Sequence, residues 1–331
     1  MPQDTTPTAA DAKPDKGHGT IAVIAALLAN LGIAVAKFVG FLITGASSML
    51  AEAFHSVADS GNQTMLLFGS RVARKEPDRK HPFGHGRVRF FAAFLVAVVL
   101  FTLGSLFSLY EGYDKLRHPH PVESPLVALA ILVVALVLEG VSLRTAVREA
   151  SPMRGRQSWW SFIRTTKQPE LAVVLLEDTA AELGLGFALL GVGLAAVTGD
   201  PLWDGLGTLA IGGLLGVVAV VLGFEMYSLL LGEAASPEEQ ATIRDTLAAT
   251  PGIARLIQLR TMHLAPEEVL VAARVELDHN LSSDDAARVI DEAQARLREA
   301  TPSARIIYLE PELPTAADTA QPGQPGSLSQ R

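Results

Sequence analysis

The sequence predicts a polytopic α-helical membrane protein with six transmembrane helices, followed by a C-terminal α+β domain in the order αββαβ. Charged residues make up only 19% of the 331 residues, below the roughly 25% of a soluble domain. Hydrophobic residues make up 49%, and the mean hydropathy is +0.30. Apolar windows of about 20 residues, long enough to cross a bilayer core, also recur along the chain.

Composition removes several classes of function. The chain has no cysteine, which excludes disulfide frameworks, thiolate metal sites and a cysteine nucleophile. Its net charge of −8 argues against general nucleic-acid binding. The low fraction of charged residues and the apolar windows instead indicate that the chain is surrounded by membrane lipid.

The predicted membrane domain covers residues 18–233. Its six apolar windows are 19–44, 47–70, 88–112, 125–147, 171–198 and 204–231. Residues 1–17 are polar and Pro-containing, which predicts a disordered tail, and they lack the pattern of a cleavable signal peptide. Loops 71–89 and 144–168 are rich in Lys and Arg. The positive-inside rule places these loops, and with them both termini, in the cytoplasm.

The predicted cytoplasmic domain covers residues 234–313. Ser236 and Glu239 form the pattern of a helical capping box, with Pro237 at the first helical position. The elements that follow are expected at Leu256–Met262 and Val269–Leu277 (strands), Ser283–Ala300 (helix) and Ala304–Leu309 (strand). Both helices would cover one face of the sheet. Residues 314–331 are predicted to be a second disordered tail.

His55 and Asp59 lie inside the second window at a spacing of four, which places both on one helix face. Ionisable groups at membrane depth are costly, so they normally face a cavity or a partner. An imidazole and a carboxylate supply half of a four-ligand metal site. The alternative is an ion pair that only joins helices, and Asn62 nearby is a candidate for supporting hydrogen bonds.

Glu177, Asp178 and Glu182 lie within the fifth window. Three carboxylates in a medium of low dielectric constant repel one another unless a cation or protons neutralise them. Asp178 and Glu182 share a face at a spacing of four, whereas Glu177 points about 100° away from Asp178. The window therefore favours a cation site, although one of the acids could instead face an arginine or the membrane interface.

Asp78, His81 and His85 follow one another at spacings of three and four in the basic loop 71–89. Two imidazoles and a carboxylate on a short loop suit a second divalent-metal site on the solvent side. The alternative is an exposed polar loop.

The segment AEAFHSVADSGNQ, followed after the basic loop by PDRKHPFGHG, resembles the cation diffusion facilitator family of divalent-metal transporters. The resemblance extends over roughly residues 19–312. The segment WWSFIRTTKQPELAVVLLEDTAAELG looks like the branch that includes mammalian zinc transporter nine. The resemblance implies a homodimer in the cell membrane, here a bacterial inner membrane, in which each protomer binds metal midway through the bilayer.

The resemblance also implies ligands on the second and fifth membrane helices. His55 and Asp59 match the motif of the second helix. On the fifth, aligning the preceding leucines gives Glu177 and Ala181, whereas the spacing gives Asp178 and Glu182; the order we expect is Asp178, Glu182, Glu177.

The other family sites follow in the same way. Asp78, His81 and His85 match the family's loop site. Ile257 and Tyr308 stand where several relatives place metal-binding histidines, and Glu310 keeps an acid there. We therefore expect the cytoplasmic domain to serve dimerisation rather than a binuclear metal site.

The expected mechanism is metal/proton antiport. One His and two or three carboxylates suit Zn²⁺ and could admit Co²⁺, Cd²⁺, Mn²⁺ or Fe²⁺. The ligands must lose protons before metal enters, so His55 and Asp59 are the expected proton carriers; export from the cytoplasm is inferred from the family. The alternatives are a passive cation channel, a scaffold that binds partners without transport, and a membrane metallohydrolase, which the lack of an HExxH-type motif disfavours. An enzyme is not expected.

Overall fold

The computed structural model describes residues 18–279 and 281–312, with side chains from Asn30 onward. Both predicted tails, 1–17 and 314–331, lie outside the described residues. Contacts divide the chain into two compact units. Among the described residues, the first contains 18–67, Leu95–Gln157 and Val173–Leu222, and the second contains Phe68–Phe94, Ser158–Ala172, 223–279 and 281–312. The predicted domain limits at residues 18, 233 and 313 stay predictions.

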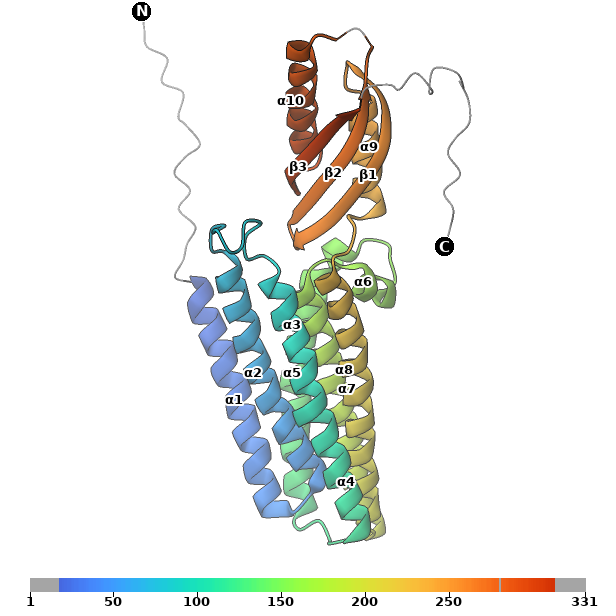
Figure 1. The fold of residues 1–331 in the computed structure, drawn as a ribbon. Coiled ribbons are helices and arrows are strands. Elements are labelled where there is room, and N and C mark those ends of the chain that lie inside the picture. The colour runs from blue at the N-terminus through green and yellow to red at the C-terminus, as the bar shows by residue number, and fades with distance from the viewer. Residues whose placement is uncertain (1–17, 280, 313–331) are drawn as a thin grey trace, which may run out of the picture. The chain divides into compact units, whose positions relative to one another are not determined.

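Long helices lie side by side in the first unit (Figure 1). The helices of residues 18–231 are α1 (His18–Thr44), α2 (Ser47–Ala73), α3 (Val88–Val99), the π-helical segment η1 (Leu100–Leu106), α4 (Phe107–Arg117), α5 (Pro125–Arg154), α6 (Trp159–Thr165), α7 (Pro169–Thr198) and α8 (Leu202–Leu231). Each predicted window coincides with one of these helices or runs. The short helix α6, which begins at an N-cap where Ser158 Oγ accepts from the Ser161 N–H, was not predicted.

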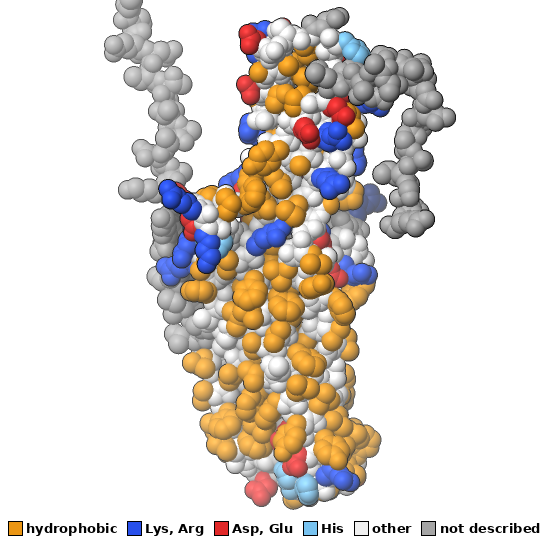
Figure 2. All heavy atoms as spheres, in the orientation of Figure 1, with side chains coloured by type: hydrophobic (Ala, Val, Ile, Leu, Met, Phe, Trp, Pro, Cys, Tyr) orange, Lys and Arg blue, Asp and Glu red, His pale blue; other side chains and the backbone are white. Residues whose placement is uncertain are grey.

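Four stretches are long and apolar enough to cross a membrane: the continuous run Val88–Arg117, α5, α7 and α8. The search covers the described residues, where α1 offers only the shorter apolar stretch Asn30–Thr44. Helix α2 is long enough, but its polar residues lower its hydropathy. Six spans therefore stay a prediction. Hydrophobic side chains cover much of the outer surface of the long helices, as expected for lipid contact (Figure 2).

The third predicted helix is longer than its window and is interrupted. A π-helical segment, Leu100–Leu106, separates α3 from α4. Within it, the Ser105 hydroxyl donates to the carbonyl oxygen of Gly212 on α8 at 2.8 Å, and Gly104 lies against Leu215, also on α8. Such π-bulges accommodate an extra residue and are frequent at functional sites. Here the bulge directs a buried polar side chain at the neighbouring helix.

The α+β domain follows α8 within the second unit. Its elements are α9 (Pro237–Ala248), β1 (Ile253–Ala265), β2 (Glu268–Leu277), α10 (Ser283–Ala300) and β3 (Ala304–Glu312). The sheet order is β1-β2-β3, with β1 and β2 antiparallel and β2 and β3 parallel. The predicted order αββαβ and the capping box of Ser236 and Glu239 are confirmed, although β1 and β3 are longer than expected.

One face of this sheet carries the core of the domain. Val271 and Val275 of β2 are fully buried with Ile243 of α9 and Leu297 of α10. Because alternate residues of a strand point to opposite faces, both helices cover the same face, as predicted. Figure 1 shows α9 and α10 beside the sheet.

Candidate metal centres

A polar face runs along α2 within the first unit. Glu52, His55, Asp59 and Asn62 follow one another at spacings of three, four and three, so they share one side of the helix. His55 is 1% exposed and Asp59 13%, and the His55 Nε2 lies 3.6 Å from the Asp59 Oδ2. Helical periodicity thus places the imidazole and the carboxylate next to each other, as the spacing predicted.

His55 and Asp59 have buried polar atoms that make no hydrogen bond within the described residues. Both ring nitrogens of His55 and the Oδ1 of Asp59 are buried without a hydrogen-bond partner among the described residues. Buried polar atoms are nearly always hydrogen-bonded, so each exception needs an explanation. An imidazole nitrogen and a carboxylate oxygen left open side by side can bind a cation.

Two of the three α7 acids are bonded to neighbouring helices and interact with Asp59. The Asn62 Nδ2 donates to the Glu177 Oε1 at 2.5 Å, which joins α2 to α7. The Asp178 Oδ2 accepts from the Ser142 Oγ of α5 at 3.0 Å. Both Glu177 and Asp178 interact electrostatically with Asp59. Both acids therefore act on the carboxylate of the α2 pair, although among the described residues no three ligand atoms of this group lie within 4.8 Å of one another.

Glu182, the third acid, lies elsewhere. Its carboxylate sits against Gly140 of α5, where a Cβ would be 3.4 Å from the Glu182 Oε1. Neither His55 nor Asp59 is among the groups that influence the ionisation of Glu182. Asp178 interacts electrostatically with Asp59, whereas Glu182, four residues further along α7, does not; which α7 acids bind metal stays a prediction.

Sequence reasoning missed three ionisable groups in this region. Glu139 of α5 is buried and interacts electrostatically with His55, Asp59 and Asp178. Lys37 of α1 and Glu52 of α2 are fully buried as an ion pair. Each is a charge inside an apolar run, which is by itself a signal of function in a membrane helix.

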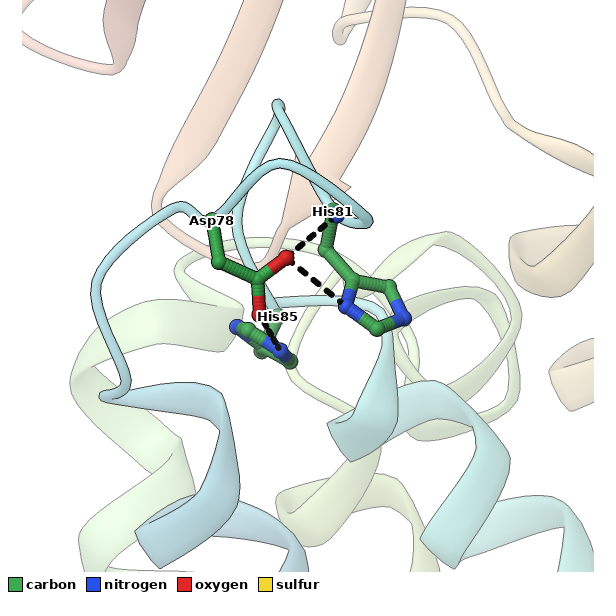
Figure 3. Close-up of side chains that lie close together, drawn as sticks. All are labelled: Asp78, His81 and His85. Atoms are coloured by element: carbon green, nitrogen blue, oxygen red, sulfur yellow. Dashed lines mark hydrogen bonds and ion pairs between the residues drawn. The ribbon is translucent and has the colours of Figure 1, made fainter.

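The loop residues Asp78, His81 and His85 form a compact cluster outside the helices (Figure 3). One ligand atom from each residue lies within 4.8 Å of the others, and in residues 18–279 and 281–312 no other group of three His, Asp or Glu residues meets this limit. The Asp78 Oδ1 is 3.3 Å from the His81 Nδ1, and the Asp78 Oδ2 is 3.6 Å from the His85 Nε2. Figure 3 shows the carboxylate between the two rings.

The backbone of the loop orients this carboxylate. The backbone N–H of His81 donates to the Asp78 Oδ1 at 2.6 Å, and that of Lys80 at 2.8 Å. The hydrogen bond from the His81 N–H is the main reason that the pKa of Asp78 lies below its usual value. Gly84, at φ +81°, makes the turn that returns the chain toward His85. The cluster thus offers a fixed anion and two imidazoles, a donor set suited to Zn²⁺.

Within residues 253–279 and 281–312, no three His, Asp or Glu residues come together as the loop cluster does. Ile257 of β1 and Tyr308 of β3 are exposed hydrophobic side chains. Glu310 lies 3.7 Å from the guanidinium of Arg274 on β2. These side chains form a mixed apolar and ion-paired surface.

Comparison with known proteins gives two family matches. The profile of the cation efflux transmembrane domain matches residues 23–231, and that of the cation efflux protein cytoplasmic domain matches residues 235–312. Over 265 residues the chain is 34% identical to "Proton-coupled zinc antiporter SLC30A9, mitochondrial" of Mus musculus, which covers 80% of this chain and 47% of that protein. The human protein of the same name is also 34% identical, with 46% of its length covered. The chain therefore spans about half the length of these relatives.

A bacterial relative is matched over nearly its whole length. "Cation-efflux pump FieF" of Escherichia coli is 29% identical over 292 residues, which covers 88% of this chain and 91% of that protein.

Proposed function

The chain belongs to the cation efflux family, and from this membership we propose that it exports Zn²⁺ from the cytoplasm in exchange for protons. Membership makes it a multi-pass membrane protein and a cation efflux transporter, not an enzyme. The zinc and proton assignments draw on relatives named as proton-coupled zinc antiporters. The donor set of imidazole and carboxylates agrees with them.

The observation that carries the proposal is the open pair on α2. The His55 ring nitrogens and the Asp59 Oδ1 have no hydrogen-bond partner in the part of the chain that the structure describes. Glu177 and Asp178 of α7 complete a four-ligand N/O shell around one divalent ion, the geometry that Zn²⁺ favours. Glu182 serves as a reserve ligand that would have to move from its position against Gly140.

Proton coupling follows from the ligand chemistry. Metal binds only to neutral imidazole and ionised carboxylate, so binding at the site releases protons. His55 and Asp59, which share the site, carry these protons back when the metal leaves. The buried carboxylates are neutralised by the metal in the metal-bound state and by protons in the metal-free state, so their charge is never left uncompensated in the membrane.

The membrane arrangement rests on the same proposal. Helices α1 and α2 cross the bilayer with the other four, because the family match covers residues 23–231 without interruption. The basic loops 71–89 and 144–168 then face the cytoplasm, with both termini. The bacterial inner membrane is the proposed location, since a bacterial relative is matched over 91% of its length. The loop residues Asp78, His81 and His85 hold a second ion on that side, and residues 234–313 form the dimer domain of a homodimer, as the name of the matched domain suggests.

Proteoliposomes test the proposal. The purified chain is reconstituted with a pH gradient, and Zn²⁺ uptake and proton flux are followed with fluorescent indicators. We expect Zn²⁺ uptake coupled to proton movement, abolished by Asp59→Asn and retained by Asp200→Asn, which removes an exposed acid after α7.

Each other result selects an alternative. Zn²⁺ flux that moves no protons would identify a passive channel. No flux of Zn²⁺, Co²⁺, Cd²⁺, Mn²⁺ or Fe²⁺ in the wild-type protein would favour a scaffold. Undiminished flux in Asp59→Asn would reject the site.

A further inference from the structure

A buried cation lies beside the α2 pair. The Lys37 side chain of α1 is 0% exposed, and its Nζ donates to the Glu52 Oε2 at 3.0 Å and to the Ser56 Oγ at 2.9 Å. Both acceptors belong to α2 and lie four residues apart, on the side that carries His55. Lys37 therefore joins α1 to the polar face of α2.

Glu52 is held from a third side by α7. Gly184 of α7 lies so close that a Cβ on it would be 2.6 Å from the Glu52 Oε1. The absence of a side chain at Gly184 leaves the space that Glu52 fills. One carboxylate oxygen thus faces the ammonium of Lys37, and the other faces the backbone of α7.

Three potential ligands on α2 therefore differ in availability. Glu52, His55 and Asp59 share one helix face, and a carboxylate at position 52 could join the other two around a metal ion. The His55 nitrogens and the Asp59 Oδ1 have no hydrogen-bond partner among the described residues, whereas Glu52 is neutralised by Lys37. A compact ammonium occupies the position that a second cation on Glu52 would need.

The ion pair also acts on the site electrostatically. Both Lys37 and Glu52 influence the ionisation of His55 and of Asp59, with opposite signs. In a medium of low dielectric constant such interactions are strong, and loss of one partner leaves the other charge uncompensated. Together, Lys37 and Glu52 add almost no net charge to the site. Loss of either residue leaves the charge of the other uncompensated.

We propose that Lys37 is a resident counter-cation that withholds Glu52 from the metal shell and thereby sets how tightly the α2 site holds its ion. The ion leaves readily because only His55, Asp59 and the α7 acids bind it. The inference rests on the proposed function, in which those residues hold the transported metal. Lys37 is a positioning residue here and contacts no cargo.

Opposite single substitutions test this role. Lys37→Met frees a buried carboxylate next to the metal, so we expect the KM for Zn²⁺ to fall about tenfold, the scale of one charge in a poorly solvated site, together with a lower maximal rate. Glu52→Gln leaves an unpaired ammonium that repels the metal, so its KM should rise. The double variant Lys37→Met/Glu52→Gln carries neither charge and should return the KM to within about twofold of wild type, as coupled neighbours require.

Metal preference gives a second measurement. A carboxylate added to the shell favours oxygen-seeking Mn²⁺ relative to Zn²⁺. Lys37→Met should therefore raise the ratio of Mn²⁺ to Zn²⁺ uptake, and Lys37→Arg, which keeps a cation, should not.

A purely structural ion pair would behave differently. Both single variants would then lose melting temperature and transport rate with KM shifts of the same sign, and this result would overturn the inference. If Lys37→Met does not fold, Lys37→Gln tests the same expected fall in KM, because it removes the cation and keeps a hydrogen-bond donor for the Ser56 Oγ. Absence of Zn²⁺ flux and Zn²⁺ binding in the wild type would instead refute the proposed function.

Discussion

The Asn62 Nδ2 of α2 donates a hydrogen bond to the Glu177 Oε1 of α7 at 2.5 Å, and both side chains are buried. This bond holds the Glu177 carboxylate against Asn62, which lies less than one helical turn from Asp59 on α2, although 115 residues separate the two partners along the chain. Amide hydrogen bonds between membrane helices hold neighbours in register. Asn62 therefore determines where Glu177 stands relative to the α2 pair.

Removing that amide should affect both stability and transport. In Asn62→Leu the Glu177 carboxyl loses its donor in a buried position, which costs about 1–3 kcal/mol. We expect a lower melting temperature in detergent and slower Zn²⁺ uptake in proteoliposomes. The control is Gln63→Leu, which changes the adjacent, partly exposed amide; equal losses in both variants would argue against a specific role of Asn62.

Substitution of the α7 acids should divide them into two groups. Glu177→Gln and Asp178→Asn each remove a carboxylate that interacts with Asp59, and we expect either to lower Zn²⁺ uptake at least about tenfold, equivalent to 1.4 kcal/mol. Glu182→Gln should change uptake by less than about threefold on the same scale. Initial rates at matched protein incorporation measure this, and a dominant effect of Glu182→Gln would restore the spacing-based assignment.

The sequence predicts the α2 pair because a spacing of four is enough to place two side chains on one face. It does not predict which α7 acids interact with Asp59, since that depends on the rotation of α7, which packing against α2 and α5 sets. Lys37 and Glu139 have no partner at helical spacing. Their environment arises only when separate helices pack together.

The fold shows the same division. Apolar windows and the capping box at Ser236 predict where helices lie, because both signals are local. The π-helical segment around Gly104 and Ser105 depends instead on contacts with Leu215 and Gly212 of α8. Hydropathy does not report contacts between helices, so the window 88–112 predicted one uninterrupted helix.

Two glycines of α7 provide a matched test of the close contact with Glu52. Gly184→Ala places a methyl group 2.6 Å from the Glu52 Oε1, whereas a Cβ at Gly186 meets nothing within 4 Å. Overpacking costs about 1–3 kcal/mol, so Gly184→Ala should lower the melting temperature and the transport rate. Gly186→Ala should be neutral or stabilising by up to about 1 kcal/mol. Equal behaviour of the two variants would show that Glu52 can move freely.

The loop cluster should bind metal independently of transport. In an Asp59→Asn background, which removes the intramembrane site, we expect Co²⁺ or Zn²⁺ to titrate one site per chain. Asp78→Asn should weaken this binding at least about tenfold, the cost of losing even an outer-shell partner of a metal site. Calorimetry on the full chain measures it, and Asp284→Asn, an exposed acid on α10, is the control.

The pH dependence of that binding follows from Asp78. Its pKa is lowered, chiefly by the His81 N–H, so its stabilising contribution is present above the unfolded value and is lost only as the pH falls through the lower folded value. Asp78 therefore stays ionised in mild acid. Metal affinity should decline as the pH falls because protons compete with the metal for its ligands, and Asp78→Asn should reduce the affinity at every pH.

His263 of β1 predicts how the stability of the second unit depends on pH. Its side chain is 2% exposed, its Nδ1 lies 3.3 Å from the Ala265 carbonyl oxygen, and its Nε2 has no hydrogen-bond partner among the described residues. Burial lowers the pKa of His263, which the nearby Glu239, Lys167 and Glu233 modify less. The folded state therefore favours the neutral ring more strongly than the unfolded state does.

The sign of the effect follows from linkage. Between the lowered folded pKa and the usual value of 6.5, the unfolded chain binds more protons, so the free energy of unfolding falls as the pH drops through this window. We expect the melting temperature, followed by circular dichroism, to decrease from pH 7 to pH 5, and His263→Leu to flatten this decrease. His279→Gln removes an exposed imidazole and should leave the slope unchanged. If the melting temperature of His263→Leu still falls with pH as steeply as that of the wild type, other groups cause the acid sensitivity, because this variant has no imidazole at position 263.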